Sequence, residues 1–133
     1  MRRRWIAFFA AVAVLAVAGG IAVHRIERHQ QQVRLARTLT GGDPDRAPDL
    51  MIAYGCAGCH EIPDLAGPRG RVGPPLRTLA ERVYIGGVAA NTPENLVRWI
   101  VNPKAFAPRT AMPVTGISEA QARDVAAYLY AHR

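Results

Sequence analysis

The sequence contains very little cysteine. Among its 133 residues only Cys56 and Cys59 carry a thiol. A structural zinc site normally takes four cysteine or histidine ligands, typically as two pairs. Apart from the histidine next to Cys59, the histidines are His24, His29 and His132, and none of them is paired at ligand spacing. A zinc-stabilised domain is therefore excluded.

Lysine is scarce in the whole chain, and acidic residues are scarce in its first 40 residues. Residues 1–40 contain seven arginines and one acidic residue, which gives a net charge of +6. Residues 41–133 contain nine arginines, the single lysine Lys104 and nine acidic residues, which gives +1. Beyond residue 40 there is no basic stripe with interleaved aromatic residues, so the sequence excludes nucleic-acid binding. With a nearly neutral domain, long-range electrostatic steering of a partner should be modest.

Proline is absent before Pro44, and charge is absent from a long stretch near the N-terminus. After three arginines at positions 2–4, nineteen residues (5–23) carry no charged or strongly polar side chain. As a helix this run is about 28 Å long, close to the roughly 30 Å hydrocarbon core of a bilayer. Arginines before the run favour keeping that end in the cytoplasm. We predict that residues 1–23 form a single-pass anchor in the cytoplasmic membrane, with the rest of the chain facing the periplasm.

A cleaved signal sequence is the alternative interpretation of residues 1–23. Ala16-Val17-Ala18 is an A-x-A cleavage pattern at the end of a short apolar region. The apolar run nevertheless continues beyond it. Residues 24–40 contain no glycine or proline and many helix formers, so we predict a polar helical linker there. Gly41-Gly42-Asp43-Pro44 ends the linker, and we place a domain over residues 41–133.

The two cysteines belong to the sequence Cys56-Ala57-Gly58-Cys59-His60, which is the C-x-x-C-H attachment motif of a c-type haem. Thiols three positions apart can bond to the two vinyl groups on one edge of a haem, and the following histidine then lies under the iron. A thioredoxin-like C-x-x-C would follow a strand in a βαβ pattern, which is absent here, and a plain disulfide would not explain His60. We predict one covalently attached haem c per chain.

Helical patterns dominate the domain, and no segment is a convincing strand. Thr92-Pro93 is typical of an N-cap followed by proline at the first helical position, and Ser118 with Gln121 forms a capping box. A core of about 93 residues is marginal alone, so we expect the haem to be part of it. The predicted fold class is all-α, with about four short helices around one haem behind the N-terminal membrane helix. These helices are expected at about 45 or 48 to 54, 77 to 84, 92 to 102, and 118 to 131.

Three methionines are candidates for the second axial ligand of the iron. Met1 lies on the wrong side of the membrane, and Met51 lies on the helix that leads into the haem motif. Met112 lies on a proline-bounded loop, 52 residues after His60. A lone methionine is more often a gap-filling core residue, but elimination and loop context favour Met112 as the ligand. A thioether ligand and a dry pocket both raise the reduction potential, and two strong-field ligands leave no position for a substrate.

The domain resembles a class I mono-haem cytochrome c, and with its anchor it is similar to membrane-bound cytochromes c that serve terminal oxidases in bacteria. The resemblance covers about residues 41–133. It depends on Cys56 to His60, Gly73-Pro74-Pro75-Leu76, the 91–103 segment with Trp99, and Ala111-Met112-Pro113.

The resemblance implies roles for two further residues. The carbonyl of Pro74 would accept the proton of His60, and Trp99 would line the haem; an ordinary turn and an ordinary core tryptophan are the alternatives. The family usually carries a glycine where the first helix crosses the last. This chain has Ala47-Pro48 at that place, so we expect a wider crossing or a later helix start.

The function implied by the resemblance is one-electron transfer without a small-molecule substrate, so we expect a carrier and not an enzyme. Its partners would be a quinol-oxidising complex or dehydrogenase as donor and a terminal oxidase as acceptor. A permanently bound electron-entry subunit of one such complex is the alternative. A peroxidase or gas-binding haem would require that Met112 does not bind the iron.

Overall fold

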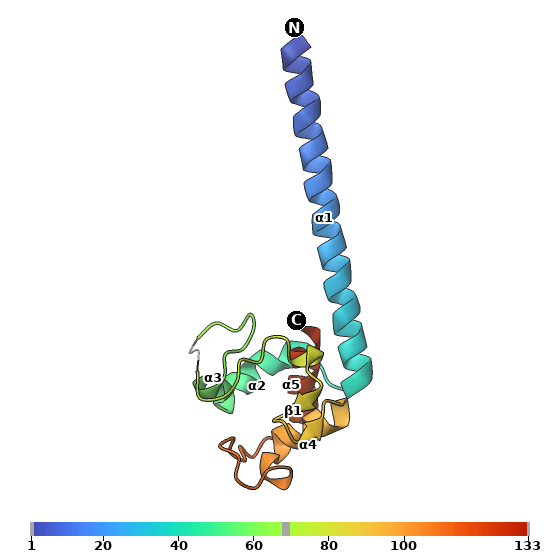
Figure 1. Cartoon of the computed structure of the whole chain (residues 1–133). Coiled ribbons are helices and arrows are strands. Elements are labelled where there is room, and N and C mark those ends of the chain that lie inside the picture. The colour runs from blue at the N-terminus through green and yellow to red at the C-terminus, as the bar shows by residue number, and fades with distance from the viewer. Residues whose placement is uncertain (1, 68–69, 133) are drawn as a thin grey trace. The chain divides into compact units, whose positions relative to one another are not determined.

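A computed structural model describes residues 2–67 and 70–132, which form two compact units, Met1–Gln31 and Gln32–Arg133 (Figure 1). Met1, which sequence reasoning rejected as an iron ligand, lies outside the described residues.

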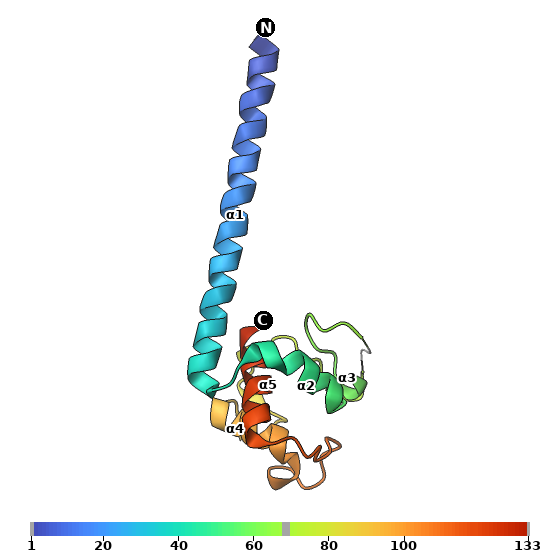
Figure 2. The ribbon, with the colours of Figure 1, turned by 180° about the vertical axis from the view of Figure 1, so that it is seen from behind.

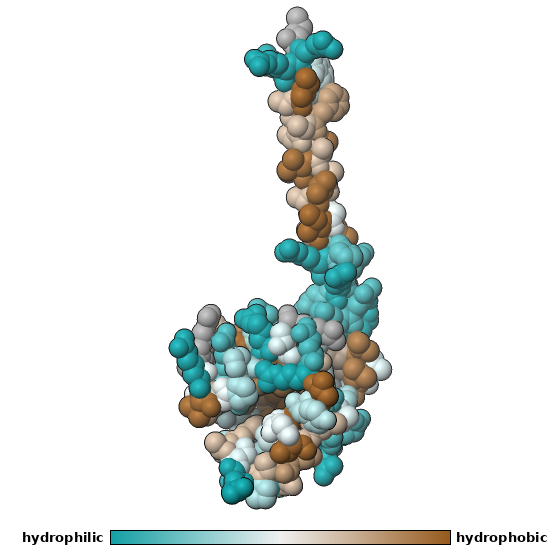
Figure 3. All heavy atoms as spheres, in the orientation of Figure 1, coloured by the Kyte–Doolittle hydropathy of each residue, from teal (hydrophilic) through white to brown (hydrophobic). Residues whose placement is uncertain are grey.

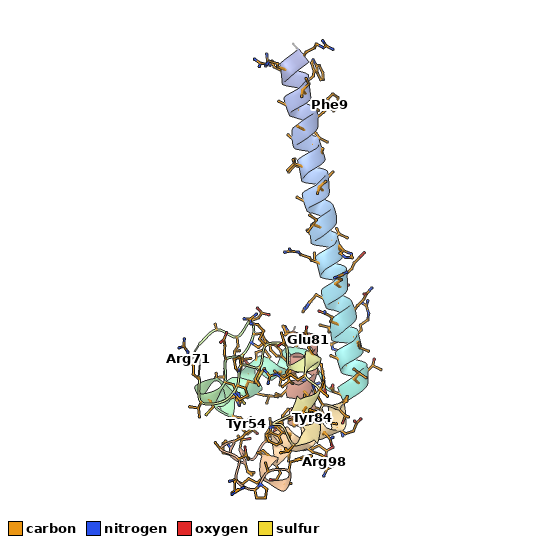
Figure 4. All side chains as sticks on the ribbon, viewed as in Figure 1. Phe9, Tyr54, Arg71, Glu81, Tyr84 and Arg98 are labelled. Atoms are coloured by element: carbon orange, nitrogen blue, oxygen red, sulfur yellow. The ribbon has the colours of Figure 1, made fainter. Side chains whose placement is uncertain are left out.

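The first unit consists of helix α1 (Arg2–Thr40) as far as Gln31. Its side chains are exposed, including that of Trp5 and that of Phe9, which is labelled in Figure 4. Figure 3 shows an apolar band between the arginines of the first turn and the charged residues that follow the apolar run. The helix is long enough and apolar enough to cross a membrane. A signal sequence near the N-terminus can meet the same criteria of length and hydropathy, so α1 is consistent with both interpretations.

The last turns of α1 belong to the second unit. Ala36 and Thr40 are buried there, and Val33 packs against the same core. The helix continues without a break through the predicted linker, as expected from its lack of glycine and proline. The compact unit begins at Gln32, earlier than the boundary predicted at Gly41. The glycines at 41 and 42 end the helix, but its preceding turns already contribute side chains to the core.

The second unit is built from short helices joined by long loops, so the predicted all-α class is confirmed apart from one short hairpin. Figures 1 and 2 show α2 and α4 on either side of α5, and both pack against it. The α-helices are α2 (Ala47–Ala53), α3 (Cys56–Cys59), α4 (Pro93–Val101) and α5 (Glu119–Ala131). Three short 3₁₀ turns are η1 (Pro44–Arg46), η2 (Leu79–Glu81) and η3 (Pro103–Ala105).

The capping patterns of the last two helices are confirmed. The Thr92 hydroxyl accepts a hydrogen bond from the backbone N–H of Asn95, with Pro93 at the first helical position of α4. Ser118 and Gln121 form the reciprocal capping box of α5. These local hydrogen bonds begin the two helices where the sequence predicted.

The helix predicted over residues 77–84 is wrong. Only the 3₁₀ turn η2 forms there, and it is followed by the antiparallel hairpin of β1 (Tyr84–Ile85) and β2 (Ala89–Ala90). Thr78 has a φ of +60°, which ends any helix at that point. Gly86 and Gly87 then adopt positive φ and turn the chain back. The expectation of no strand is therefore also wrong.

Helix α5 is at the centre of the core. All its residues from Val125 to Ala131 are buried, and side chains of α2 and α4 cover it. Met51 of α2 and Leu96 of α4 are among the largest fully buried side chains.

The closest approach of backbone to α5 that requires a glycine is at Gly42, which precedes α2. A Cβ on Gly42 would overlap the backbone of Arg123 and Asp124. The Asp124 carboxylate accepts a hydrogen bond from the backbone N–H of Asp43 at 2.6 Å, and Arg123 donates to the carbonyl of Thr40 at 3.0 Å. Ala47 is fully buried. This chain has no glycine at positions 47–48, and the close contact with α5 is made instead by Gly42, which precedes α2.

Replacing Gly42 by alanine is expected to destabilise the second unit by about 1–3 kcal/mol, because backbone cannot move aside as a flexible side chain can. Chemical denaturation of the haem-loaded protein measures the effect. Gly58→Ala is the matched control, because nothing lies within 4 Å of the added methyl group. Equal stabilities of the two variants would contradict the prediction.

Candidate functional site

The second unit contains a mainly apolar cavity of about 620 Å³, and the same unit is hollowed on the face shown in Figure 3. All six site residues predicted from the sequence line this cavity. They are Cys56, Cys59, His60, Pro74, Trp99 and Met112. Residues that are far apart along the chain are therefore brought together around one space of ligand size.

The haem-motif cysteines are placed by two consecutive short helices. Gly55, with φ of +71°, turns the chain between α2 and α3, and α3 then carries Cys56 and Cys59 on one helical turn. Both are free thiols. Burial raises the pKa of the Cys56 thiol, whereas redox-active cysteines have a lowered pKa.

The His60 ring is held by the Gly73-Pro74 segment. Its Nδ1 lies 2.8 Å from the carbonyl oxygen of Pro74. A carbonyl can only accept, so Nδ1 carries the proton and the lone pair on Nε2 remains for a metal. The backbone N–H of Gly73 also donates to the carbonyl of Cys59 at 2.8 Å.

Glycine is required at position 73 by the His60 ring. A Cβ there would overlap the ring, both of whose nitrogens lie within 3 Å of the added atom. The segment can therefore lie flat against the imidazole only with no side chain at 73.

Met112 lies on the loop between η3 and α5. Its backbone N–H donates to the Thr110 hydroxyl at 3.2 Å, and its side chain is half-buried at the cavity wall. Met51 reaches the same wall, but it is fully buried in the core. Of the two methionines at the wall, Met112 is therefore the more exposed and the one on a loop.

Trp99 forms another part of the wall from α4. Its ring abuts Gly86 of the hairpin, where a Cβ would collide with it. Phe106 lies behind it, with ring centroids 6.0 Å apart, and the Arg98 guanidinium stands 5.0 Å over the Phe106 ring. The hairpin and η3 thus hold the indole at the cavity.

Sequence reasoning missed Arg82, which also lines the cavity. Its guanidinium donates to the carbonyl of Pro75. The only sequence signal was an arginine shortly after Gly73-Pro74-Pro75-Leu76, and that signal is weak. An arginine at a mainly apolar wall is suited to a carboxylate on a bound group.

The cavity fits a haem better than a bare metal ion. Within the part of the chain that the structure describes, no three His, Cys, Asp or Glu side chains come together as a metal site. Two thiols, one imidazole with a free Nε2, one thioether and an apolar wall are instead the groups that a covalently attached haem uses. Arg82 and Arg109 also line the cavity, and a guanidinium is suited to the carboxylate of a haem propionate.

Comparison with known proteins agrees with this geometry. The family model described as cytochrome c matches residues 44–132, which covers all six predicted site residues. No curated protein matches the chain.

Proposed function

The chain belongs to the cytochrome c family, and from this premise we propose that it is a membrane-anchored carrier of single electrons in a respiratory chain. The observation that carries the proposal is the cavity, where the Cys56 and Cys59 thiols, the His60 ring and the Met112 thioether meet.

In the proposed site, Cys56 and Cys59 would hold the haem through thioether bonds, and His60 and Met112 would bind its iron. When bound, the haem supplies a one-electron redox centre. Pro74 orients the His60 ring through the hydrogen bond to Nδ1, which keeps Nε2 available and makes the imidazole a better donor. Trp99 and the apolar wall exclude water, and this raises the potential together with the thioether.

The proposed location is the cytoplasmic membrane, with α1 as a single-pass anchor and the haem domain facing the periplasm. The length and composition of α1 support an anchor, and the arginines at positions 2–4 support a cytoplasmic N-terminus. Tethering would give the domain a high effective concentration near its partners, so strong charge steering is not needed. This agrees with the near-neutral charge of residues 41–133.

The proposed partners are a quinol-oxidising complex or dehydrogenase as donor and a terminal oxidase as acceptor. A permanent subunit of one such complex would have the same haem site. Detergent extraction separates the two: recovery as a free monomer supports a carrier, and stable co-purification with one complex supports a subunit.

The absorption spectrum of the haem-loaded full chain tests the proposed iron ligation. We expect the weak long-wavelength band of sulfur-bound ferric iron, and no spectral shift when carbon monoxide is added to the ferrous protein, because both axial positions are filled. A high-spin ferric spectrum with ready carbon monoxide binding would contradict the carrier and indicate ligand binding or catalysis at an open iron.

A further inference from the structure

Asn91 connects three separate parts of the second unit. Its side-chain Nδ2 donates to the carbonyls of Leu79 at 2.8 Å and Arg82 at 2.9 Å. Its backbone N–H donates to the carbonyl of Val83 at 2.9 Å. Its Oδ1 accepts from the hydroxyl of Tyr130 on α5 at 2.8 Å. Both side-chain donors and the acceptor of one partly buried amide are therefore used.

The segment that Asn91 holds, residues 79–83, is connected by hydrogen bonds to the strip of chain beside His60. The Arg82 side chain donates to the carbonyl of Pro75. The neighbouring carbonyl, that of Pro74, lies 2.8 Å from Nδ1 of His60. Hydrogen bonds thus run from α5 through Asn91 to the Arg82 backbone, and from the Arg82 side chain to the strip of chain on which the His60 ring rests.

We infer that Asn91 is a positioning residue for His60: it holds Arg82, whose side chain donates to the Pro75 carbonyl and so holds the strip of chain on which the Pro74 carbonyl accepts the His60 Nδ1–H. The inference rests on the proposed function, in which His60 binds the haem iron. Asn91 is not part of the cavity wall and need not touch the haem. It acts on the strength of the His60 hydrogen bond.

Two features favour this role over simple packing. The Asn91 amide donates to the carbonyl of the first residue of η2, Leu79, and to that of Arg82, which follows η2, in a segment with little other regular structure. Burial, with a smaller effect of the Glu94 charge, raises the pKa of Tyr130 to about 12, so its hydroxyl stays protonated and donates throughout the neutral range. The hydrogen bond from Tyr130 of α5 to Asn91 is therefore present throughout the neutral pH range.

The test compares Asn91→Ala with Asn95→Ala in the haem-loaded full chain. Asn95 is a matched control, since its Nδ2 donates to only one carbonyl, that of Ala90 at 3.0 Å. The measurement is the exchange rate of the His60 Nδ1 proton in the reduced protein, followed by NMR. Asn91→Ala should speed this exchange at least tenfold relative to both wild type and Asn95→Ala. Exchange of the α5 backbone amides, recorded in the same sample, measures global opening.

A purely structural role would give a different pattern. The inference is overturned if the His60 proton of Asn91→Ala exchanges at the wild-type rate. It is also overturned if the exchange of this proton accelerates only by the same factor as the exchange of the α5 backbone amides. Tyr130→Phe removes only the hydroxyl that donates to Asn91 and keeps the ring. This variant can be tested even if Asn91→Ala fails to fold, and it should also speed the exchange of the His60 proton. Failure of the proposed function is distinguishable, because it would appear in the wild-type spectrum before any variant is made.

Discussion

A Met112→Leu variant is expected to lose the sulfur-to-iron absorption band of the ferric protein and to bind carbon monoxide readily when reduced. Leucine has a similar volume but no donor atom, so the sixth position opens while the wall of the cavity stays filled. Among haem proteins, the identity of the axial ligands changes the reduction potential over a range of about 0.8 V. Loss of the thioether, which favours ferrous iron, should lower the reduction potential by on the order of 0.1 V. Spectroelectrochemistry measures both the band and the potential.

Met51→Leu is the matched control for this experiment. Met51 lines the same cavity but is fully buried in the core. The same substitution there should keep the band, and it should cost less than about 1.5 kcal/mol in stability because the volume is conserved. If Met51→Leu lost the band and Met112→Leu kept it, the ligand would be assigned to the wrong methionine.

A Gly73→Ala variant is expected to have a severely impaired haem site. The new methyl group would occupy the space of the His60 ring, so either the ring or the Gly73-Pro74 strip must move. Either movement breaks the hydrogen bond between Nδ1 and the Pro74 carbonyl. Overpacking of this kind typically costs about 1–3 kcal/mol, and here it displaces an axial ligand as well. We expect a reduced yield of haem-loaded protein and a high-spin fraction in its ferric spectrum.

Two other glycines separate this effect from a general loss of stability. Gly58→Ala lies within the haem motif, but its methyl group meets no protein atom within 4 Å, so the His60 ring should stay in place and the spectrum should be unchanged. Gly42→Ala should lower stability through the contact with α5 and leave the spectrum of the folded fraction normal. A low-spin spectrum of wild-type shape in Gly73→Ala would show that the His60 ring tolerates the added methyl group.

The sequence predicted best those features that depend on residues close together along the chain. The N-caps at Thr92 and Ser118 are local hydrogen bonds, and the structure has both. The wrong prediction of a helix over residues 77–84 also has local physical causes, which the pattern of residue types did not show. Residues 77–84 include good helix formers, but Thr78 adopts a left-handed conformation and the glycines at 86 and 87 turn the chain into a hairpin.

The haem motif and the long apolar run were determined by the sequence alone, because covalent attachment requires a fixed spacing of thiols and a membrane span requires a minimum length. Only the tertiary structure brought Met112, Trp99 and Pro74 to the cavity that contains the motif. It also decided that Gly42 supplies the close contact with α5, and that Asn91 and Arg82 support the strip of chain under His60. These contacts join residues that are far apart along the chain, and no periodicity or spacing in the sequence encodes which distant carbonyl a given side chain will reach.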